Sequence, residues 1–228
     1  MSEVPDLTSI FFYILVTGLP TTLILTVLAL GFGFLLGMLL AIMRVYGERE
    51  LAWIGSVYEK LLRGIPVLVL IFIFAYGIPE IFWYLDSLYR QVASIILALS
   101  LRSAAYQSQI FRGAILSVNT GQMVAARAVG MKKIQAFRHI ILPQAIRLAV
   151  PGWTNEYSVV IKDTSFAYSF GVIELTKAAY RVSVNFPILW APTMLIAAIL
   201  YFAVTYPVTR IFGQKQNKKL KELGIGGR

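Results

Sequence analysis

The side chains of this 228-residue chain that could do chemistry are ionisable and amide groups set inside apolar segments. Arg102 and Gln107 lie in one such segment, and Asn155, Glu156 and residues 162–165 (Lys-Asp-Thr-Ser) lie in another. A charged side chain costs at least about 2.5–3.5 kcal/mol at the centre of a membrane helix, so it needs a partner or a water-lined path. These opposite charges therefore either bind a polar solute or neutralise one another as structural pairs.

Bond-making chemistry has little support elsewhere in the sequence. Cysteine is absent, and the single histidine, His139, lies among basic residues, which argues against disulfides, metal centres and a histidine-based dyad. The chain has no phosphate-binding G-x-x-x-x-G-K-[ST] motif and no Ser/His/Asp set or carboxylate pair in a credible position. The sequence thus predicts no catalytic residue, no metal, no cofactor and no ATP hydrolysis by this chain.

The elements that position these groups are apolar helices. With 58% hydrophobic and 14% charged residues, the chain is too apolar for a soluble domain, and several runs reach the roughly 20 residues that cross a bilayer. We expect an all-α membrane protein with about five transmembrane helices, N-terminus outside and C-terminus inside, because the expected inner segments are basic. The net charge of +10 is then explained by anionic lipid and not by nucleic acid. The expected spans are 19–43, 66–79, 91–116, 148–168 and 188–211.

Proline, glycine and charge refine these expectations. Pro20 should separate an interfacial segment, 8–18, from the first span. The fourth span should be interrupted by Pro151-Gly152 and by its polar residues, Asn155-Glu156 and 162–165. Residues 44–63 carry four basic and three acidic side chains, so we expect a cytoplasmic turn with a helix along the inner surface. Small residues every four positions predict close helix packing along the first span; they are Gly18, Thr22, Thr26, Gly33 and Gly37.

Residues 121–143 form a polar, basic segment between the apolar ones. Residues 102–147 hold seven Lys or Arg and no Asp or Glu, which places this segment in the cytoplasm. Its alanines favour a helix that ends at a left-handed Gly130, and a second short helix, about 132–141, should run into Pro143. Two helices joined at a glycine are typical of a docking element for a soluble partner, but an ordinary amphipathic loop has the same pattern.

The segment resembles the EAA loop of ABC-importer permeases, whose pattern runs roughly GQ-x-EAA-x-x-LG and ends in LPQA. Here it reads Gly121-Gln122-Met123-Val124-Ala125-Ala126-Arg127-Ala128-Val129-Gly130, followed by Leu142-Pro143-Gln144-Ala145. The further motifs are similar to those of the polar amino-acid uptake branch; they are Thr21-Thr22, Arg63-Gly64-Ile65-Pro66, Ala104-Ala105-Tyr106, Arg112-Gly113-Ala114 and Lys162-Asp163-Thr164-Ser165. One departure stands out, since Val124 occupies the place of the motif's glutamate.

The resemblance implies a type I ABC importer permease in the plasma membrane of a prokaryote, a multi-pass chain forming one transmembrane domain over residues 1–228. It implies a coupling loop at 117–146 and a basic cytoplasmic tail at 213–228. The implied partners are two copies of an ATP-binding subunit, a second permease copy or paralogue, an extracytoplasmic substrate-binding protein, membrane lipid and an amino-acid substrate, but no nucleic acid. The implied contacts with the ATPase are Gly121, Ala125, Ala126, Arg127, Gly130 and Met131.

The resemblance also suggests how the buried charges act. Arg102 and Glu156 would complement the carboxylate and ammonium groups of an amino acid; the expected path residues are Arg102, Gln107, Asn155, Glu156 and Thr164. The alternative is that Arg102 with Glu156, or Lys162 with Asp163, form structural ion pairs. A bulky residue at Gly130 or Ala126 is expected to uncouple ATP hydrolysis from uptake. The competing function classes are an ATPase-independent channel or secondary transporter for small polar solutes and, less well supported, a membrane-bound enzyme.

Overall fold

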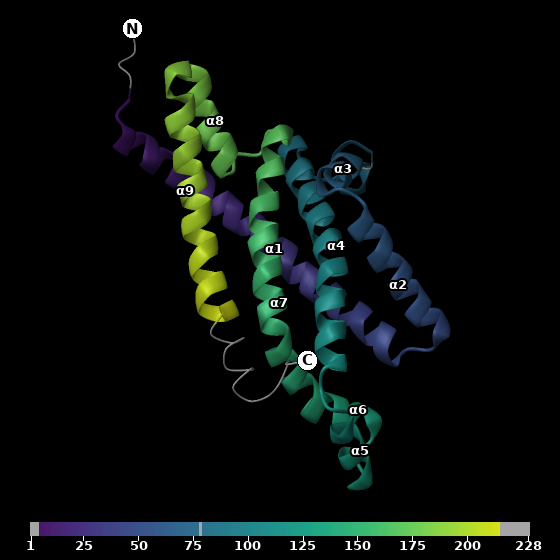
Figure 1. The fold of residues 1–228 in the computed structure, drawn as a ribbon. Coiled ribbons are helices and arrows are strands. Elements are labelled where there is room, and N and C mark those ends of the chain that lie inside the picture. Colours follow the sequence, from purple (N-terminus) through teal and green to yellow (C-terminus); the bar gives the residue numbers. More distant parts are fainter. Residues whose placement is uncertain (1–4, 78, 215–228) are drawn as a thin grey trace. The chain divides into compact units, whose positions relative to one another are not determined.

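The computed structural model describes residues 5–77 and 79–214, and the elements within these ranges are all helical (Figure 1). The expected lysines of the tail, Lys215, Lys218, Lys219 and Lys221, lie outside the described residues. The α-helices are α1 (Leu7–Tyr46), α2 (Arg49–Gly64), α3 (Val67–Phe72), α4 (Ser87–Leu116), α5 (Thr120–Ala128), α6 (Lys133–Ala136), α7 (Leu142–Asp163), α8 (Leu175–Asn185) and α9 (Trp190–Val208). Short π- and 3-10-helical segments connect them; they are η1 (Ile73–Gly77), η2 (Pro79–Phe82), η3 (Phe137–Ile141), η4 (Thr164–Phe170), η5 (Pro187–Leu189) and η6 (Thr209–Gln214).

The two prolines that were expected to end or interrupt a helix lie inside helices that continue past them. α1 runs through Pro20 for 40 residues, so the separate interfacial segment 8–18 was a wrong prediction. α7 likewise runs through Pro151, and the predicted interruption there is wrong. A chain in lipid has no water to satisfy freed backbone groups, so continuing the helix costs less than opening it. The change of helix type comes later, where α7 gives way to the 3-10 segment η4 at Asp163 and Thr164.

The helix lengths agree with about five membrane crossings. Among the described residues, α1 and the stretch Pro187–Phe212 are long and apolar enough to cross a membrane. α2 with Val67–Gly77 qualifies as a third crossing if this bent pair is one broken span. α4 and α7 have 30 and 22 residues, enough for a hydrocarbon core of about 30 Å at about 1.5 Å per residue. Their polar side chains explain why apolarity alone does not select them.

The chain divides into two compact units that alternate along the sequence. Unit 1 comprises residues 1–32, 65–102 and 157–207, and unit 2 comprises 33–64, 103–156 and 208–228. The core of unit 1 joins the start of α1 to α8 and α9, through buried residues that include Ile14, Leu175 and Ala197. The core of unit 2 joins the end of α1 to α4 and the start of α7; its buried residues include Ala41, Phe111 and Ala145.

The small-residue stripe of α1 packs against neighbouring backbone, which confirms that prediction. In unit 1, a Cβ at Gly18 would lie 2.7 Å from the Cα of Leu175, and the Thr22 hydroxyl accepts a 3.2 Å hydrogen bond from the Leu175 amide. In unit 2, a Cβ at Gly37 would lie 2.9 Å from the Ala104 carbonyl oxygen. The absence of a side chain at these glycines is what allows the helices to approach.

The segment 44–63 contains the expected helix, α2, and this helix packs against its neighbours. α2 packs against two helices of unit 2: Gly55 leaves room for the Arg44 side chain of α1, whose Cγ would lie 2.8 Å from a Cβ there. At the far end of α2, the guanidinium of Arg63 lies 5.0 Å from the centre of the Tyr106 ring of α4. α2 is therefore part of the packed helix bundle of unit 2.

Candidate coupling surface and substrate path

The helix α5 begins and ends at well-defined caps. The Asn119 side-chain oxygen accepts a 2.8 Å hydrogen bond from the Gly121 amide, which satisfies one of the free amides of the first turn. At the other end Gly130 has a φ of 85°, the left-handed conformation predicted for it. The next amide, that of Met131, donates to the Ala126 carbonyl at 3.1 Å. α5 is thus a short helix with fixed ends, beyond the end of α4 (Figure 1).

The predicted second helix is present and continues further than expected. α6 is followed directly by η3 and α7, so Pro143 does not end the helix. Pro143 is the second residue of α7. At the start of α6, the Gln135 side chain accepts a 2.8 Å hydrogen bond from the Lys132 amide. The two-helix segment is therefore held to unit 2 through α7.

The six residues predicted to contact an ATPase differ in exposure. Gly121, Ala125, Arg127 and Gly130 are exposed, and Met131 is half-buried. Ala126 is only 2% exposed, because it faces the protein interior. A bulky residue at Ala126 would therefore disturb the packing of α5 itself, whereas the others remain accessible to a partner.

In unit 1, Arg102 pairs with an aspartate at the end of α7. Its Nη1 lies 3.4 Å from Oδ2 of Asp163, and Arg102 is only 8% exposed. Thr164 is fully buried and donates its hydroxyl to the Ile161 carbonyl at 2.7 Å. Lys162, which precedes Asp163 in the chain, is exposed. Spacing along the chain cannot predict an ion pair between residues 61 positions apart. The sequence had suggested Glu156 as the partner of Arg102 and Lys162 as the partner of Asp163.

In unit 2, Gln107 links two helices. Its amide nitrogen donates to the Ser103 hydroxyl at 3.0 Å, and its oxygen accepts from the Trp153 indole N–H at 3.0 Å. Glu156 is 2% exposed, whereas Asn155 is exposed. Buried hydrogen-bonded amides of this kind orient helices as well as solutes, so Gln107 joins α4 to α7 in addition to any contact with a substrate.

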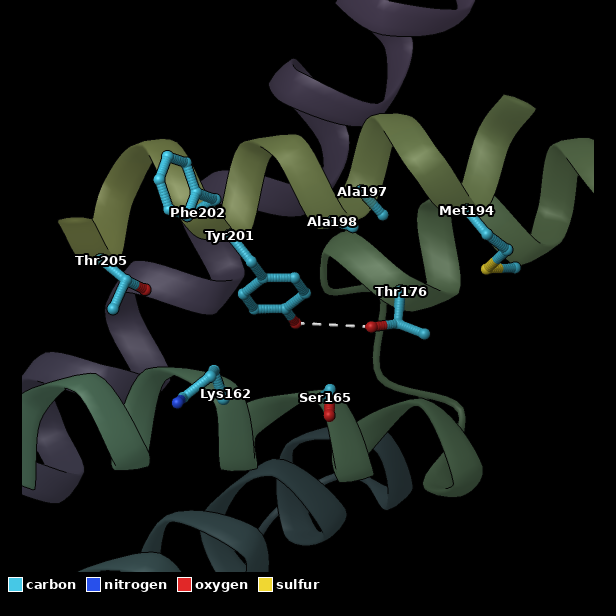
Figure 2. A pocket seen from close by; sticks show the side chains of 9 residues that line it. All are labelled: Lys162, Ser165, Thr176, Met194, Ala197, Ala198, Tyr201, Phe202 and Thr205. Carbon is cyan, nitrogen blue, oxygen red and sulfur yellow. Dashed lines mark hydrogen bonds between the residues drawn. The ribbon is translucent and has the colours of Figure 1, made fainter. Parts of the chain in front are cut away.

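A hollow of about 520 Å³ lies in unit 1, between the end of α7, α8 and α9. Figure 2 shows Lys162 and Ser165 on one side and Tyr201 on the other, with the Tyr201 hydroxyl 3.4 Å from that of Thr176. The Tyr201 hydroxyl also donates to Glu174 at 2.6 Å. The volume of the hollow lies in the range of small-molecule sites, about 300–1,000 Å³. An ammonium group beside hydroxyls is suited to hold a carboxylate.

The comparison with known families decides among the remaining function classes. The sequence profile of the family described as "Binding-protein-dependent transport system inner membrane component" matches residues 33–222. The chain belongs to this family. The family consists of non-catalytic permease subunits of ABC transporters, so the comparisons do not support an ATPase-independent channel or an enzyme.

Individual relatives agree with this assignment. The permease is 38% identical over 191 residues to the probable amino-acid permease protein YxeN of Bacillus subtilis (strain 168), with 84% of each chain covered. It is 36% identical over 203 residues to the nopaline transport system permease protein NocM of Agrobacterium fabrum, covering 86% of this chain and 84% of the relative. A solved structure described as an amino acid ABC transporter with histidines matches with a TM-score of 0.79 and 28% identity, over 95% of this chain and 100% of that one. The permease therefore has the type I ABC importer fold and is a membrane protein.

A buried ion cluster of the permease was missed by sequence reasoning. In unit 2, the carboxylate of Glu59 lies between Arg44, at 3.6 Å, and Arg63, with which it forms a close ion pair. The spacing of Glu59 and Arg63 by four residues is a signal that sequence analysis could have used, because such residues share a helix face. The contact with Arg44 comes from another helix and has no such signal.

Proposed function

We propose that this permease is the membrane subunit of an ATP-driven importer of polar amino acids. The observation that carries the proposal is the two-helix segment of unit 2, capped at Asn119 and closed at the left-handed Gly130, with an exposed basic surface. The names of YxeN, a probable amino-acid permease, and of the solved amino acid ABC transporter support the substrate class. The whole chain, 1–228, acts as one multi-pass transmembrane domain in the plasma membrane of a prokaryote.

The energy comes from a separate subunit. Two ATP-binding subunits hydrolyse ATP, and a second permease copy or paralogue and an extracytoplasmic binding protein complete the importer. Nucleotide binding favours one of two conformations, and the docked segment passes that preference to the membrane helices. The contact with the ATP-binding subunit is made by Gly121, Ala125, Arg127, Gly130 and Met131. The buried Ala126 packs α5 against the rest of unit 2.

The test of this function is ATP hydrolysis by the complete permease in lipid vesicles, alone and with its ATPase, with and without binding protein and amino acids. The expected result is no hydrolysis by the permease alone and substrate-stimulated hydrolysis by the complex. Comparing amino acids in the same assay ranks the substrates. If the ATPase does not associate, or hydrolyses ATP at the same rate with and without every amino acid, the proposed function is wrong.

The substrate path uses the polar side chains predicted for it, Arg102, Gln107, Asn155, Glu156 and Thr164, of which all but Asn155 are buried. Within this set, Arg102 binds the carboxylate of the amino acid. This proposal is supported by the burial of Arg102, which is 8% exposed, because charged side chains buried in membrane helices commonly mark substrate paths.

Replacing Arg102 by glutamine tests whether Arg102 binds substrate or serves only in a structural ion pair. Arg102→Gln is expected to raise the half-maximal substrate concentration of transport at least about tenfold, equivalent to about 1.4 kcal/mol, because a charge-assisted contact is lost. Asp163→Asn removes the charge pairing of Arg102 with Asp163 but keeps the guanidinium, so its half-maximal substrate concentration should stay within about twofold. The measurement is uptake against amino-acid concentration in vesicles. Equal effects of both variants would show that the pair is structural only.

A further inference from the structure

The coupling segment of this permease is apolar at a position where the family motif has a carboxylate. Val124 is 68% exposed on α5, and two further apolar residues of the segment, Val129 and Ile134, are 78% and 75% exposed. Three large apolar side chains exposed within one short polar segment make that segment a candidate interaction site. A glutamate at this place would need a cation or water on the partner side, whereas valine is stabilised by an apolar neighbour.

Val124 borders a hollow that is also apolar. The hollow has a volume of about 370 Å³ and lies in unit 2 beside α5, at the ends of α1 and α4. Its lining residues are mainly aliphatic or aromatic and include Tyr46, Leu116, Met123, Val124 and Ile141. The Tyr46 ring packs against that of Phe137, with ring centres 5.2 Å apart and ring planes at 71°, so Tyr46 is supported on that side. An apolar side chain of a partner that entered this preformed hollow would be transferred out of water, which is favourable.

The rest of the segment is strongly basic. Arg127, Lys132, Lys133 and Arg138 are exposed, and residues 102–147 contain no Asp or Glu to balance them. Arg127 donates to the Met131 carbonyl at 3.0 Å, which holds its side chain beside the end of α5. Charge complementarity therefore favours a partner with carboxylates around an apolar centre.

We propose that the ATPase subunit of this importer docks an apolar side chain against Val124, in the hollow beside α5, and surrounds it with carboxylates that face the basic edge. The proposal rests on the proposed function and adds the chemistry of the partner. An ATPase that presents a cation at this place, suited to the motif's glutamate, would be a poor partner. The apolar contact thus determines which ATPase subunits this permease accepts.

The experiment measures the affinity of the purified ATPase for the complete permease in lipid nanodiscs. Val124→Glu is expected to weaken binding at least about 30-fold, as for a residue at the centre of an interface, while Val124→Ile stays within about twofold of the wild type. Gln122→Glu is the matched control, because Gln122 is also exposed on α5 and gains the same charge; it should not weaken binding. Raising the salt concentration should weaken wild-type binding through the carboxylate contacts.

The other outcomes are distinguishable. If Val124→Glu binds as well as or better than wild type, Val124 faces lipid or a cation and the proposal is overturned. Equal weakening by Val124→Glu and Gln122→Glu would also overturn it, because the effect would then be charge alone. If the wild-type permease binds no ATPase at all, the proposed function itself fails. Thermal melting of each variant controls for folding.

Discussion

Replacing Gly18 by alanine is expected to lower the melting temperature of the permease by about 6–12 °C. The new Cβ would lie 2.7 Å from the Cα and 2.8 Å from the amide nitrogen of Leu175. Backbone atoms cannot swing away as a flexible side chain does, so α1 and α8 would have to separate. Overpacking of this kind costs about 3 kcal/mol, and for a chain of this size 1 kcal/mol corresponds to about 2–4 °C. The measurement is thermal unfolding in detergent.

Gly31→Ala is the matched control on the same helix. Apart from its chain neighbours and the backbone of its own helix turns, a Cβ at Gly31 has no atom within 4 Å. Alanine is favoured over glycine inside a helix by about 1 kcal/mol. This variant should melt at or above the temperature of the wild type. If Gly18→Ala and Gly31→Ala melt together, the close packing of α1 on α8 does not exist in the protein.

Replacing Glu59 by glutamine should be the most destabilising change among the charged residues of unit 2. Its carboxylate lies 3.6 Å from a guanidinium nitrogen of Arg44 and forms a closer pair with Arg63. The side chains of Arg44 and Glu59 are 8% and 6% exposed. Removing one partner leaves a buried cation uncompensated, at a cost of about 3–5 kcal/mol. The same detergent melting experiment measures the loss.

Arg63→Gln tests the explanation, because it removes the other pairing of the same carboxylate. The Arg63 side chain is 40% exposed, so water compensates for much of the loss, and we expect about 1 kcal/mol or less. The double variant Arg44→Leu/Glu59→Leu should recover part of the stability lost in Glu59→Gln, since it leaves no buried charge on either partner. Comparable losses for Glu59→Gln and Arg63→Gln would contradict the burial argument.

Local signals predicted most of the elements. The apolar run and polar ends of 91–116 led to α4, and the glycine after a run of alanines led to the left-handed Gly130. Pro20 and Pro151 misled, because the rule that proline ends a helix holds where water can satisfy the freed backbone groups. In both places the helix continues.

The candidate site was less accessible to sequence reasoning. The pairings of Arg102 with Asp163 and of Arg44 with Glu59 join different helices, and only the folded chain brings them together. Ala125 and Ala126 are identical in type and adjacent, yet one is exposed and the other buried. Which alanine faces the protein depends on how α5 is rotated against α6 and η3, and a nine-residue helix with three alanines has no strong apolar face that would determine it.

The alternation of the two units has a practical meaning for exchanging selectivity between related transporters. The chain passes between the units after residues 32, 64, 102, 156 and 207, and four of these positions lie inside α1, α4, α7 and α9. A chimaera that replaces one unit with that of a relative therefore needs five junctions, most of them within continuous helices. Each such junction must preserve helical phase, because an inserted or deleted residue turns everything beyond it by about 100°. Specificity in this permease is thus more readily altered by single substitutions than by transplanting a contiguous stretch of chain.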